Sequence, residues 1–450
     1  MMTTLQKTKD TTIFSKAFFD KFAAAQNDPQ WVAEKRAAAW SVFEDTPMPT
    51  THDEPWRRTS LKRVHWADFS PEVAPSVQPV SVLGDLPPML QNLLDAEKEA
   101  AGRLAMVNGQ LVFAEIDPAL AEKGVIFTDL RTAVQEHAEL VQPHLMAKAV
   151  PPSDGKFAAL NAALWQNGVF LYVPKNVAVE FPFQTAILLD GAGASSIHRT
   201  LIVAEESAEV NYIEETASLN DADPGLAVGV VEIIAQPNAS VRYVDVQQWG
   251  HNVFNFNTKR ALAHEDSNVY WDLGELGSRL TKTFIDTELI GDGSNTECNG
   301  VYFLDGEQHV DIDTMMRHIG YSTGGDLLLH GALKDTARAI FIGMIKIEPS
   351  GQLTNSYLKN QNLLLDDTCR ADSIPALEID ANDVRASHAA TISQVEEEYV
   401  FYLMSRGIPR STAVQMIVEG FFETVFARMG DERVRERLMD AVTQKMAARL

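Results

Sequence analysis

One stretch of the sequence gathers histidine and aspartate side chains that could hold a metal ion. His309, Asp311 and Asp313 alternate along a strand-like segment, and His318 and His330 follow it. Imidazole and carboxylate groups are ligands for borderline divalent metals. Because alternating residues of a strand share one face, the three side chains are expected to lie together. A solvated sheet face without a metal is the competing interpretation.

Asp311 and Asp313 also support a hypothesis of a different class, a β-helical carbohydrate-active enzyme. Two acid groups that flank a glycosidic bond can carry out its cleavage. This alternative requires both carboxylates to lie on an exposed face. The sequence contains no Walker-type Gly-Lys-Ser/Thr loop, no Rossmann glycine pattern and no His-Glu-x-x-His pair. No catalytic residue is therefore assigned, and a non-enzymatic protein is favoured.

A second group of polar residues directly precedes the C-terminal region. Glu378, Asp380, Asn382 and His388 punctuate a strand-like segment. A neutral imidazole that solvent can reach is a competent iron or zinc ligand. The simpler interpretation is a last strand with an exposed rim, and the residues alone leave both interpretations open.

Cysteine is scarce, which limits the metal chemistry of the chain. Cys298 and Cys369 are the only cysteines, whereas an all-cysteine iron–sulfur site takes four. A lone cysteine is more often a small buried hydrophobe than a ligand. The chain alone is therefore expected to bind no stable cluster.

The composition excludes several classes of partner. The 450 residues include 38 Lys and Arg against 62 Asp and Glu, a formal net charge of −24. A field of this sign repels nucleic acid and anionic lipid. The first ten residues show no secretory leader pattern, and no apolar stretch of about 18 residues predicts a membrane span. We expect a cytoplasmic protein that binds neither nucleic acid nor membrane.

A repeat in the middle of the chain predicts how the polar groups are positioned. Ala208, Ala239 and Ser267 each begin a segment with valine two residues later and an aromatic residue four residues later, and Ser294 continues the register. Periods of this length indicate stacked supersecondary units. With strand-only content, the pattern favours a β-helix whose coils stack as parallel sheets. A large antiparallel sandwich is the alternative.

Three regions follow from these patterns. Residues 1–150 are expected to be mainly helical, residues 151–395 to form the strand core, and residues 396–450 to be helical again. Gly407 is a helix stop. Apolar residues from Val414 to Phe426, including Phe421 and Phe422, form one broad stripe. The stripe either docks a partner or packs against the end of the β-helix.

Several of these segments match a known family. They are Asn360-Gln-Asn-Leu-Leu-Leu365, Pro375-Ala-Leu-Glu-Ile-Asp-Ala-Asn-Asp-Val-Arg-Ala-Ser-His-Ala-Ala-Thr391, Glu397-Glu-Tyr-Val-Phe-Tyr-Leu-Met-Ser-Arg-Gly-Ile408 and, upstream, His198-Arg-Thr-Leu-Ile-Val203, Gln308-His-Val-Asp311 and Ala337-Arg-Ala-Ile-Phe-Ile-Gly343. Together they closely resemble the SufB/SufD family of a bacterial iron–sulfur cluster assembly system. Asp383-Val-Arg-Ala-Ser-His-Ala-Ala-Thr391 is most similar to SufD members, because SufB members tend to have His-Glu-Ala before the threonine.

The resemblance implies a fold and a set of partners. The implied fold is a right-handed parallel β-helix flanked by N-terminal and C-terminal helical regions. A SufB-like paralogue would pair with this chain through the β-helices, and a SufC-like ABC ATPase would dock on the C-terminal helices. The implied role is a non-catalytic SufD-like scaffold of a SufBCD-type complex, with a contribution to iron entry. A SufB-like scaffold is the alternative within the family, and the isolated chain is a candidate homodimer.

The resemblance also implies site residues. His388 falls on a Ser-His motif of the family and is the candidate ligand of iron or of a transient cluster at the interface with SufB. Many relatives have cysteine where this chain has Ala386, so ligation would depend on His388 and on groups of the partner. No cofactor is expected to bind stably to the chain alone, and a flavin is a further candidate component of the complex. The expected partner-binding residues are Tyr399, Arg406, Gly407, Val414, Phe421 and Phe422.

Overall fold

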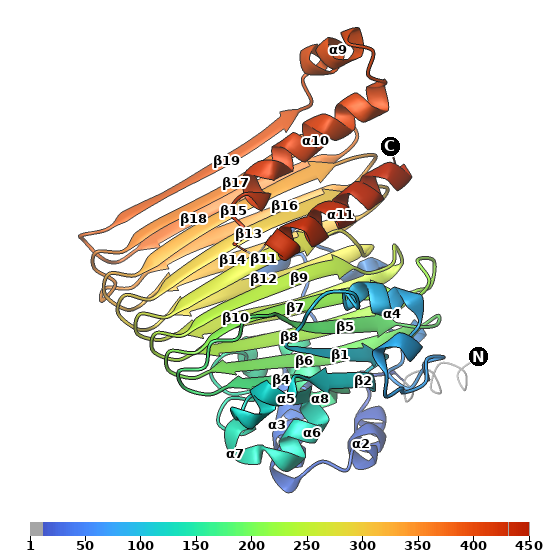
Figure 1. Ribbon diagram of the computed structural model, residues 1–450, viewed down its shortest axis with the longest axis vertical. Helices are drawn as coiled ribbons and strands as arrows, with labels where there is room; N and C mark the ends of the chain where they lie inside the picture. Colours follow the sequence, from blue (N-terminus) through green and yellow to red (C-terminus); the bar gives the residue numbers. More distant parts are fainter. Residues whose placement is uncertain (1–11, 431, 450) are drawn as a thin grey trace.

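The computed structural model describes residues 12–430 and 432–449, and its core is a parallel β-helix (Figure 1). Successive strands from β4 to β19 alternate between two sheets, so each coil contributes one strand to each sheet. The first sheet contains β4 (Asn167–Val173), β6 (Ala194–Ala204), β8 (Gly225–Ala235), β10 (Val253–Ala263), β12 (Leu280–Leu289), β14 (His309–His318), β16 (Arg338–Ile347) and β18 (Arg370–Ile379). The second contains β5 (Phe183–Leu189), β7 (Glu209–Ser218), β9 (Ser240–Gln248), β11 (Asn268–Glu275), β13 (Asn295–Leu304), β15 (Gly324–Leu333), β17 (Asn355–Leu364) and β19 (Arg385–Gln394).

The parallel pairing confirms the predicted β-helix and shows that the antiparallel sandwich is wrong. The repeated segments begin strands of the second sheet, where Tyr212 pairs in register with Tyr243, and Tyr243 with Trp271. Inside the β-helix, the Tyr212 and Tyr243 rings stack with centroids 5.7 Å apart, and the Tyr243 and Trp271 rings meet edge to face at 5.4 Å. The turns before these strands contain Asn238 and Asp266 with φ of 59° and 52°. Short polar side chains tolerate this left-handed conformation, which lets the chain turn into each new coil.

The N-terminal region closes one end of the β-helix. Part of it is strand rather than helix: β1 (Gly102–Val107) extends the second sheet in parallel with β5, and β2 (Gln110–Ile116) pairs antiparallel with β1. In the first sheet, β3 (Ile126–Asp129) pairs antiparallel with β4. The helices of this region are α2 (Lys16–Ala25), α3 (Gln30–Asp45), α4 (Pro88–Leu93), α5 (Pro118–Glu122), α6 (Leu130–Glu136), α7 (Ala138–Val141) and α8 (Lys156–Leu164).

The N-terminal region also covers the outer face of the first sheet. Phe157 of α8 stacks on Phe256 of β10, with ring centroids 4.1 Å apart. Trp56, from a short 3-10 helix (Glu54–Trp56), lies near the same rings. Residues far apart in the sequence therefore form one apolar core on this face. The prediction about a secretory leader concerned the first ten residues, which lie outside the described residues.

The C-terminal helices lie along the second sheet and beyond its end. They are α9 (Glu397–Ser405), α10 (Arg410–Phe426) and α11 (Glu432–Arg449). In Figure 1, α10 and α11 lie over the second sheet and run roughly along its strands, whereas α9 projects beyond β19. Among the described residues, no helix combines the length and the hydropathy needed to cross a membrane.

Candidate functional site

The C-terminal end of the β-helix is open. Strands β18 and β19 are the last members of the two sheets, and each pairs with a neighbour on one side only among the described strands. The opposite edge of each strand therefore presents unpaired backbone donors and acceptors, which favour pairing with another chain. No helix from the described part of the chain lies across this end in Figure 1.

His388 lies on this last coil and faces the interior side of the β-helix. It pairs in register with Leu358 of β17, whose side chain is fully buried in the core. Side chains at paired positions of parallel strands project to the same face of the sheet. The His388 side chain nevertheless remains exposed, because β19 is the end of the stack.

Apolar side chains surround the same end. Leu377 and Ile379 of β18 are 38% and 40% exposed, and Ile392 of β19 is 46% exposed. Leu377 and Ile379 pair in register with Ile345 and Ile347, which are fully buried in the preceding coil. The end of the stack thus exposes residues of the type that the coils below bury. An exposed apolar surface of this kind is typical of an interaction site.

Thiolates are not available at this end from the described residues. Ala386 stands in register with Ser356 and is half-buried. Cys298 and Cys369 are both buried, and burial raises the pKa of both thiols above its usual range. This confirms the prediction that Cys298 is a small buried hydrophobe, whereas the buried Cys369 thiol donates to the Asp366 carbonyl.

Helix α9 presents a second exposed surface. Tyr399, Phe401 and Tyr402 are 59%, 71% and 56% exposed. The guanidinium of Arg406 lies 5.2 Å from the centre of the Tyr402 ring. Gly407 has a φ of 85°, and α9 ends two residues before it, which confirms the predicted helix stop.

The apolar stripe of α10 packs against the second sheet. Phe422 is fully buried, in one cluster with Val301 and Phe303 of β13. Val414 and Phe421 are half-buried and contact the same cluster. Of the two possibilities for the stripe, docking a partner or packing against the β-helix, the structure shows the second. Of the partner-binding residues expected from the sequence, Tyr399 and Arg406 are exposed whereas Phe422 is not.

The residues around Asp311 form a closed structural cluster. His309, Asp311 and Asp313 share the outer face of β14, as predicted, but residues of the N-terminal region cover this face. The Nζ of Lys282 lies 2.9 Å from Asp311 Oδ1 and 3.0 Å from Asp313 Oδ2. Thr59 donates to Asp311 and lies 2.9 Å from His309 Nε2. Burial raises the pKa of Asp313 to about 7, against the opposing effect of the Lys282 ammonium.

Two predictions about this cluster are therefore wrong. The face is not solvated, because Asp311 is buried and the side chain of Asp313 is 15% exposed. The alternative of a β-helical carbohydrate-active enzyme required both carboxylates to be exposed, so the structure does not support it. The Lys282 ammonium takes the place that a cation would occupy between the two carboxylates. Within residues 12–430 and 432–449, no group of three or more His, Cys, Asp and Glu side chains is arranged to hold a metal.

His318 and His330 are separated from this cluster. His318 points into the β-helix, where Nδ1 lies 2.9 Å from the Thr323 hydroxyl and Nε2 lies 3.0 Å from the Ser356 hydroxyl. Burial lowers the pKa of His318 to about 4, so the ring is neutral at neutral pH. His330 faces outward from β15 and contacts α10.

Charged side chains inside the β-helix are a feature that the sequence analysis missed. Glu214 accepts hydrogen bonds from the hydroxyls of Tyr212 and Tyr243, at 3.0 Å and 2.9 Å. Lys259 forms an ion pair with Asp245, and both side chains are 3% exposed. The sequence did indicate their position. Glu214 lies two residues after the buried Tyr212 and four after the buried Val210, and alternate residues of a strand share one face, so Glu214 projects inward.

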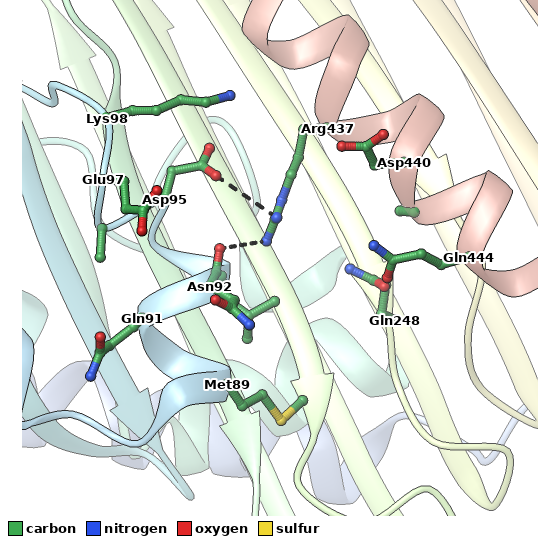
Figure 2. A pocket seen from close by; sticks show the side chains of 13 residues that line it. Met89, Gln91, Asn92, Asp95, Glu97, Lys98, Gln248, Arg437, Asp440 and Gln444 are labelled. Carbon is green, nitrogen blue, oxygen red and sulfur yellow. Dashed lines mark hydrogen bonds and ion pairs between the residues drawn. The ribbon is translucent and has the colours of Figure 1, made fainter.

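A cavity of about 740 Å³ lies between α11 and the turn after α4, away from the open end (Figure 2). Arg437 of α11 spans the gap: its Nη2 donates to the Asn92 carbonyl at 2.9 Å, and its Nη1 lies 3.8 Å from Asp95. Its Nε and Nη2 also pair with Glu215 of β7, at 2.6 Å and 2.8 Å. Arg437 therefore joins the C-terminal helix to the N-terminal region.

Fold and site together define a class: a β-helical protein with one closed end, one open end and an exposed terminal helix. Comparison with known proteins gives the family. The model of the SufBD core domain of iron–sulfur cluster assembly proteins matches residues 187–421, and the model of the SufBD N-terminal region matches residues 15–185. This chain belongs to the SufBD family of iron–sulfur cluster assembly proteins.

Individual relatives agree with the family models. An iron–sulfur cluster assembly SufBD family protein of Staphylococcus epidermidis is 33% identical over 405 residues, which cover 88% of this chain and 86% of the relative. Proteins of the same description from Staphylococcus haemolyticus and Staphylococcus aureus are also 33% identical, with the same coverage. The similarity thus spans both the N-terminal region and the β-helix.

Proposed function

We propose that this chain is the SufD-like scaffold subunit of a SufBCD-type complex that assembles iron–sulfur clusters in the cytoplasm. The observation that carries the proposal is the open end of the β-helix, whose last coil exposes both His388 and several apolar side chains. Covering such a surface removes apolar area from water. In the proposed complex, the β-helix of a SufB-like paralogue covers it. A second copy of this chain is the occupant when the paralogue is absent.

His388 is the proposed ligand of iron or of a nascent cluster, which is the cargo of the complex. Its imidazole is exposed at the end that the partner covers, and imidazole suits iron as well as zinc. The chain's own thiols are buried, and Ala386 supplies no sulfur. The partner must therefore supply the thiolates. The same argument favours the SufD-like role over the SufB-like role, which requires a cluster-building thiolate.

The proposed docking surface for the SufC-like ATPase is α9 with the Arg406–Gly407 turn. Its aromatic side chains are exposed although the rest of the C-terminal region packs against the sheet. Energy then comes from the nucleotide cycle of the ATPase, and this chain performs no catalysis. The acidic surface favours iron cations close to it, over a Debye length of about 8–10 Å. A flavin, in this proposal, belongs to the complex and not to the isolated chain.

Co-expression with SufB-like and SufC-like chains, followed by native mass determination, tests the proposal. The expected species contains one copy of this chain, one SufB-like chain and two SufC-like chains. A chain that remains alone, or pairs only with itself in the presence of both partners, would contradict the proposed role.

A further inference from the structure

A second cavity, of about 590 Å³, lies between the segment after Trp56 and the first sheet. Its volume is in the range of about 300–1,000 Å³ that is typical of small-ligand sites. The buried side chains of Phe254 and Leu280 belong to its lining and are each 8% exposed. The cavity is separate from the open end of the β-helix, because its strand residues belong to β10, β12, β14 and β16.

The lining of this cavity is strongly basic in an acidic protein. Among its lining residues, the only carboxylate belongs to Glu307. The basic residues come from three separate parts of the chain, the 58–63 segment, the start of β12 and the start of β16. They are Arg58, Lys62, Arg63, Arg279 and Arg338. The whole chain has a formal charge of −24, so this concentration of cations is opposite in sign to the rest of the molecule.

The cations of the cavity are only loosely neutralised. Glu307 Oε2 lies 3.8 Å from Arg63 Nη1 and 3.6 Å from Arg279 Nη2, whereas a charge-assisted hydrogen bond is about 2.7–2.9 Å long. The Glu307 side chain is 70% exposed. Arg58 and Lys62 form no ion pair within the described residues. A stronger anion could therefore displace a single, solvated carboxylate and contact both guanidinium groups.

The neighbouring charges leave this positive field in place. Arg338 Nη2 lies 3.1 Å from Asp372, which partly neutralises it. Asp311 and Asp313, behind the cavity, both pair with Lys282, which offsets one of the two charges, and burial raises the pKa of Asp313 to about 7. His309 also belongs to the lining, and burial together with the charges of Arg338, Lys282 and Arg63 lowers its pKa to about 4. The ring is therefore neutral and adds no charge of its own.

We propose that this cavity binds a small organic diphosphate, of which a nucleoside diphosphate is the representative. The guanidinium groups of Arg63 and Arg279 contact the diphosphate, because the planar guanidinium group pairs with phosphate oxygens in a bidentate manner. Phe254 and Leu280 contact the organic group. The site is independent of cluster assembly and of the ATPase, and the isolated chain carries all of it.

Calorimetric titration of the isolated full-length chain at low ionic strength tests the site with three probes: ADP, inorganic pyrophosphate and adenosine. ADP is expected to bind more tightly than pyrophosphate, and adenosine is expected to give no measurable binding. Binding of ADP should weaken as salt is added, since added salt screens exposed charges. Pyrophosphate binding as tight as that of ADP would overturn the organic part of the proposal, and ADP binding no tighter than adenosine would overturn all of it.

Matched variants identify the residues. Arg63→Gln and Arg279→Gln should each weaken ADP binding about tenfold, the effect of one lost charged hydrogen bond. Arg57→Gln is the control, because it removes the same charge from an exposed neighbour that does not line the cavity. Glu307→Gln should tighten binding, because it removes the competing carboxylate. An equal loss in Arg57→Gln would show that the attraction is non-specific and would overturn the site. Weaker binding in Glu307→Gln would show that this carboxylate does not compete with the ligand, and it would also overturn the site.

Discussion

The imidazole of His330 stacks on the ring of Phe421, with ring centroids 4.4 Å apart and an angle of 18° between the planes. Its Nδ1 donates a hydrogen bond of 2.8 Å to the backbone carbonyl of the same residue. The two contacts attach α10 to β15 directly beside the buried Phe422. Helix α10 is therefore part of the folded core of this chain, whereas α9 is not.

The first prediction concerns this attachment. Phe422→Ala should lower the free energy of unfolding by roughly 3–5 kcal/mol, because it leaves a cavity in the cluster between α10 and the sheet. Phe401→Ala removes the same ring from an exposed position on α9 and should change stability little. Urea unfolding followed by circular dichroism measures both, and equal effects of the two substitutions would contradict the packing.

The second prediction concerns ATPase docking. Replacing Tyr399, Phe401 and Tyr402 together with serine should abolish co-purification with the SufC-like ATPase and leave the unfolding midpoint unchanged. Deletion of residues 396–450 would also remove α10 and expose the sheet, so it cannot separate docking from folding. Val82→Ser is the control, since Val82 is 58% exposed and lies far from α9 in sequence. Retention of the ATPase by the triple variant would place the docking surface elsewhere.

The third prediction concerns His388. His388→Ala should leave folding intact, because the side chain is exposed, and should lower the yield of iron and acid-labile sulfide in the reconstituted complex. His52→Ala removes another exposed imidazole and should leave the yield unchanged. An undiminished yield in His388→Ala would remove this residue from the mechanism.

The fourth prediction concerns Lys282. Lys282→Met leaves Asp311 and Asp313 buried without their cation, and removing one partner of a buried ion pair costs roughly 3–5 kcal/mol. Lys346→Met breaks the exposed pair with Glu378 and should have no measurable effect on stability. Thermal unfolding of both variants distinguishes the buried pair from the exposed one. An unchanged melting temperature in Lys282→Met would mean that the carboxylates do not need the ammonium.

The fifth prediction concerns pH. Burial lowers the pKa of His318 to about 4 in the folded chain, below the unfolded value of about 6.5. The unfolded chain therefore binds the proton first, and stability that is present above pH 6.5 is lost as the pH falls toward 4. The slope is at most about 1.4 kcal/mol per pH unit for one histidine. His318→Gln should lose less stability than the unchanged chain between pH 6.5 and pH 5, as measured by urea unfolding at each pH.

The β-helix could be predicted from the sequence because its repeat is local. Several successive coils place a small buried residue after a left-handed turn residue, as in Ser207 followed by Ala208, Asn238 by Ala239 and Asp266 by Ser267. The contact of Thr59 with His309 and Asp311 could not be predicted in this way, because it joins residues about 250 positions apart. The alternation of side chains along a strand predicted that Asp311 and Asp313 share one face. It could not show that the N-terminal segment covers that face.

Buried charge was the other limit of the sequence reasoning. Glu214, Asp245 and Lys259 are charged residues of the kind usually found on a surface. Their positions in the alternating pattern of each strand nevertheless face the core. Only the pairing of strands from different coils brings Lys259 beside Asp245 and the Tyr243 hydroxyl beside Glu214. The basic cavity was missed for a related reason, since Arg63, Arg279 and Arg338 are far apart in the sequence and come together only where coils stack beside the N-terminal segment.

The difference between the two ends of the β-helix limits how these molecules can assemble. Strands β2 and β3 also have a neighbour on one side only, but helices of the N-terminal region lie at their end of the β-helix, whereas no described helix lies across β18 and β19 (Figure 1). End-to-end pairing is therefore expected at one end only. Two open ends can meet and complete each other, and the resulting pair offers no further end to a third chain. A fold built from parallel strands with unpaired edges is thereby protected from growing into a fibre. In the proposed end-to-end pairing, the closed end thus makes the assembly self-limiting.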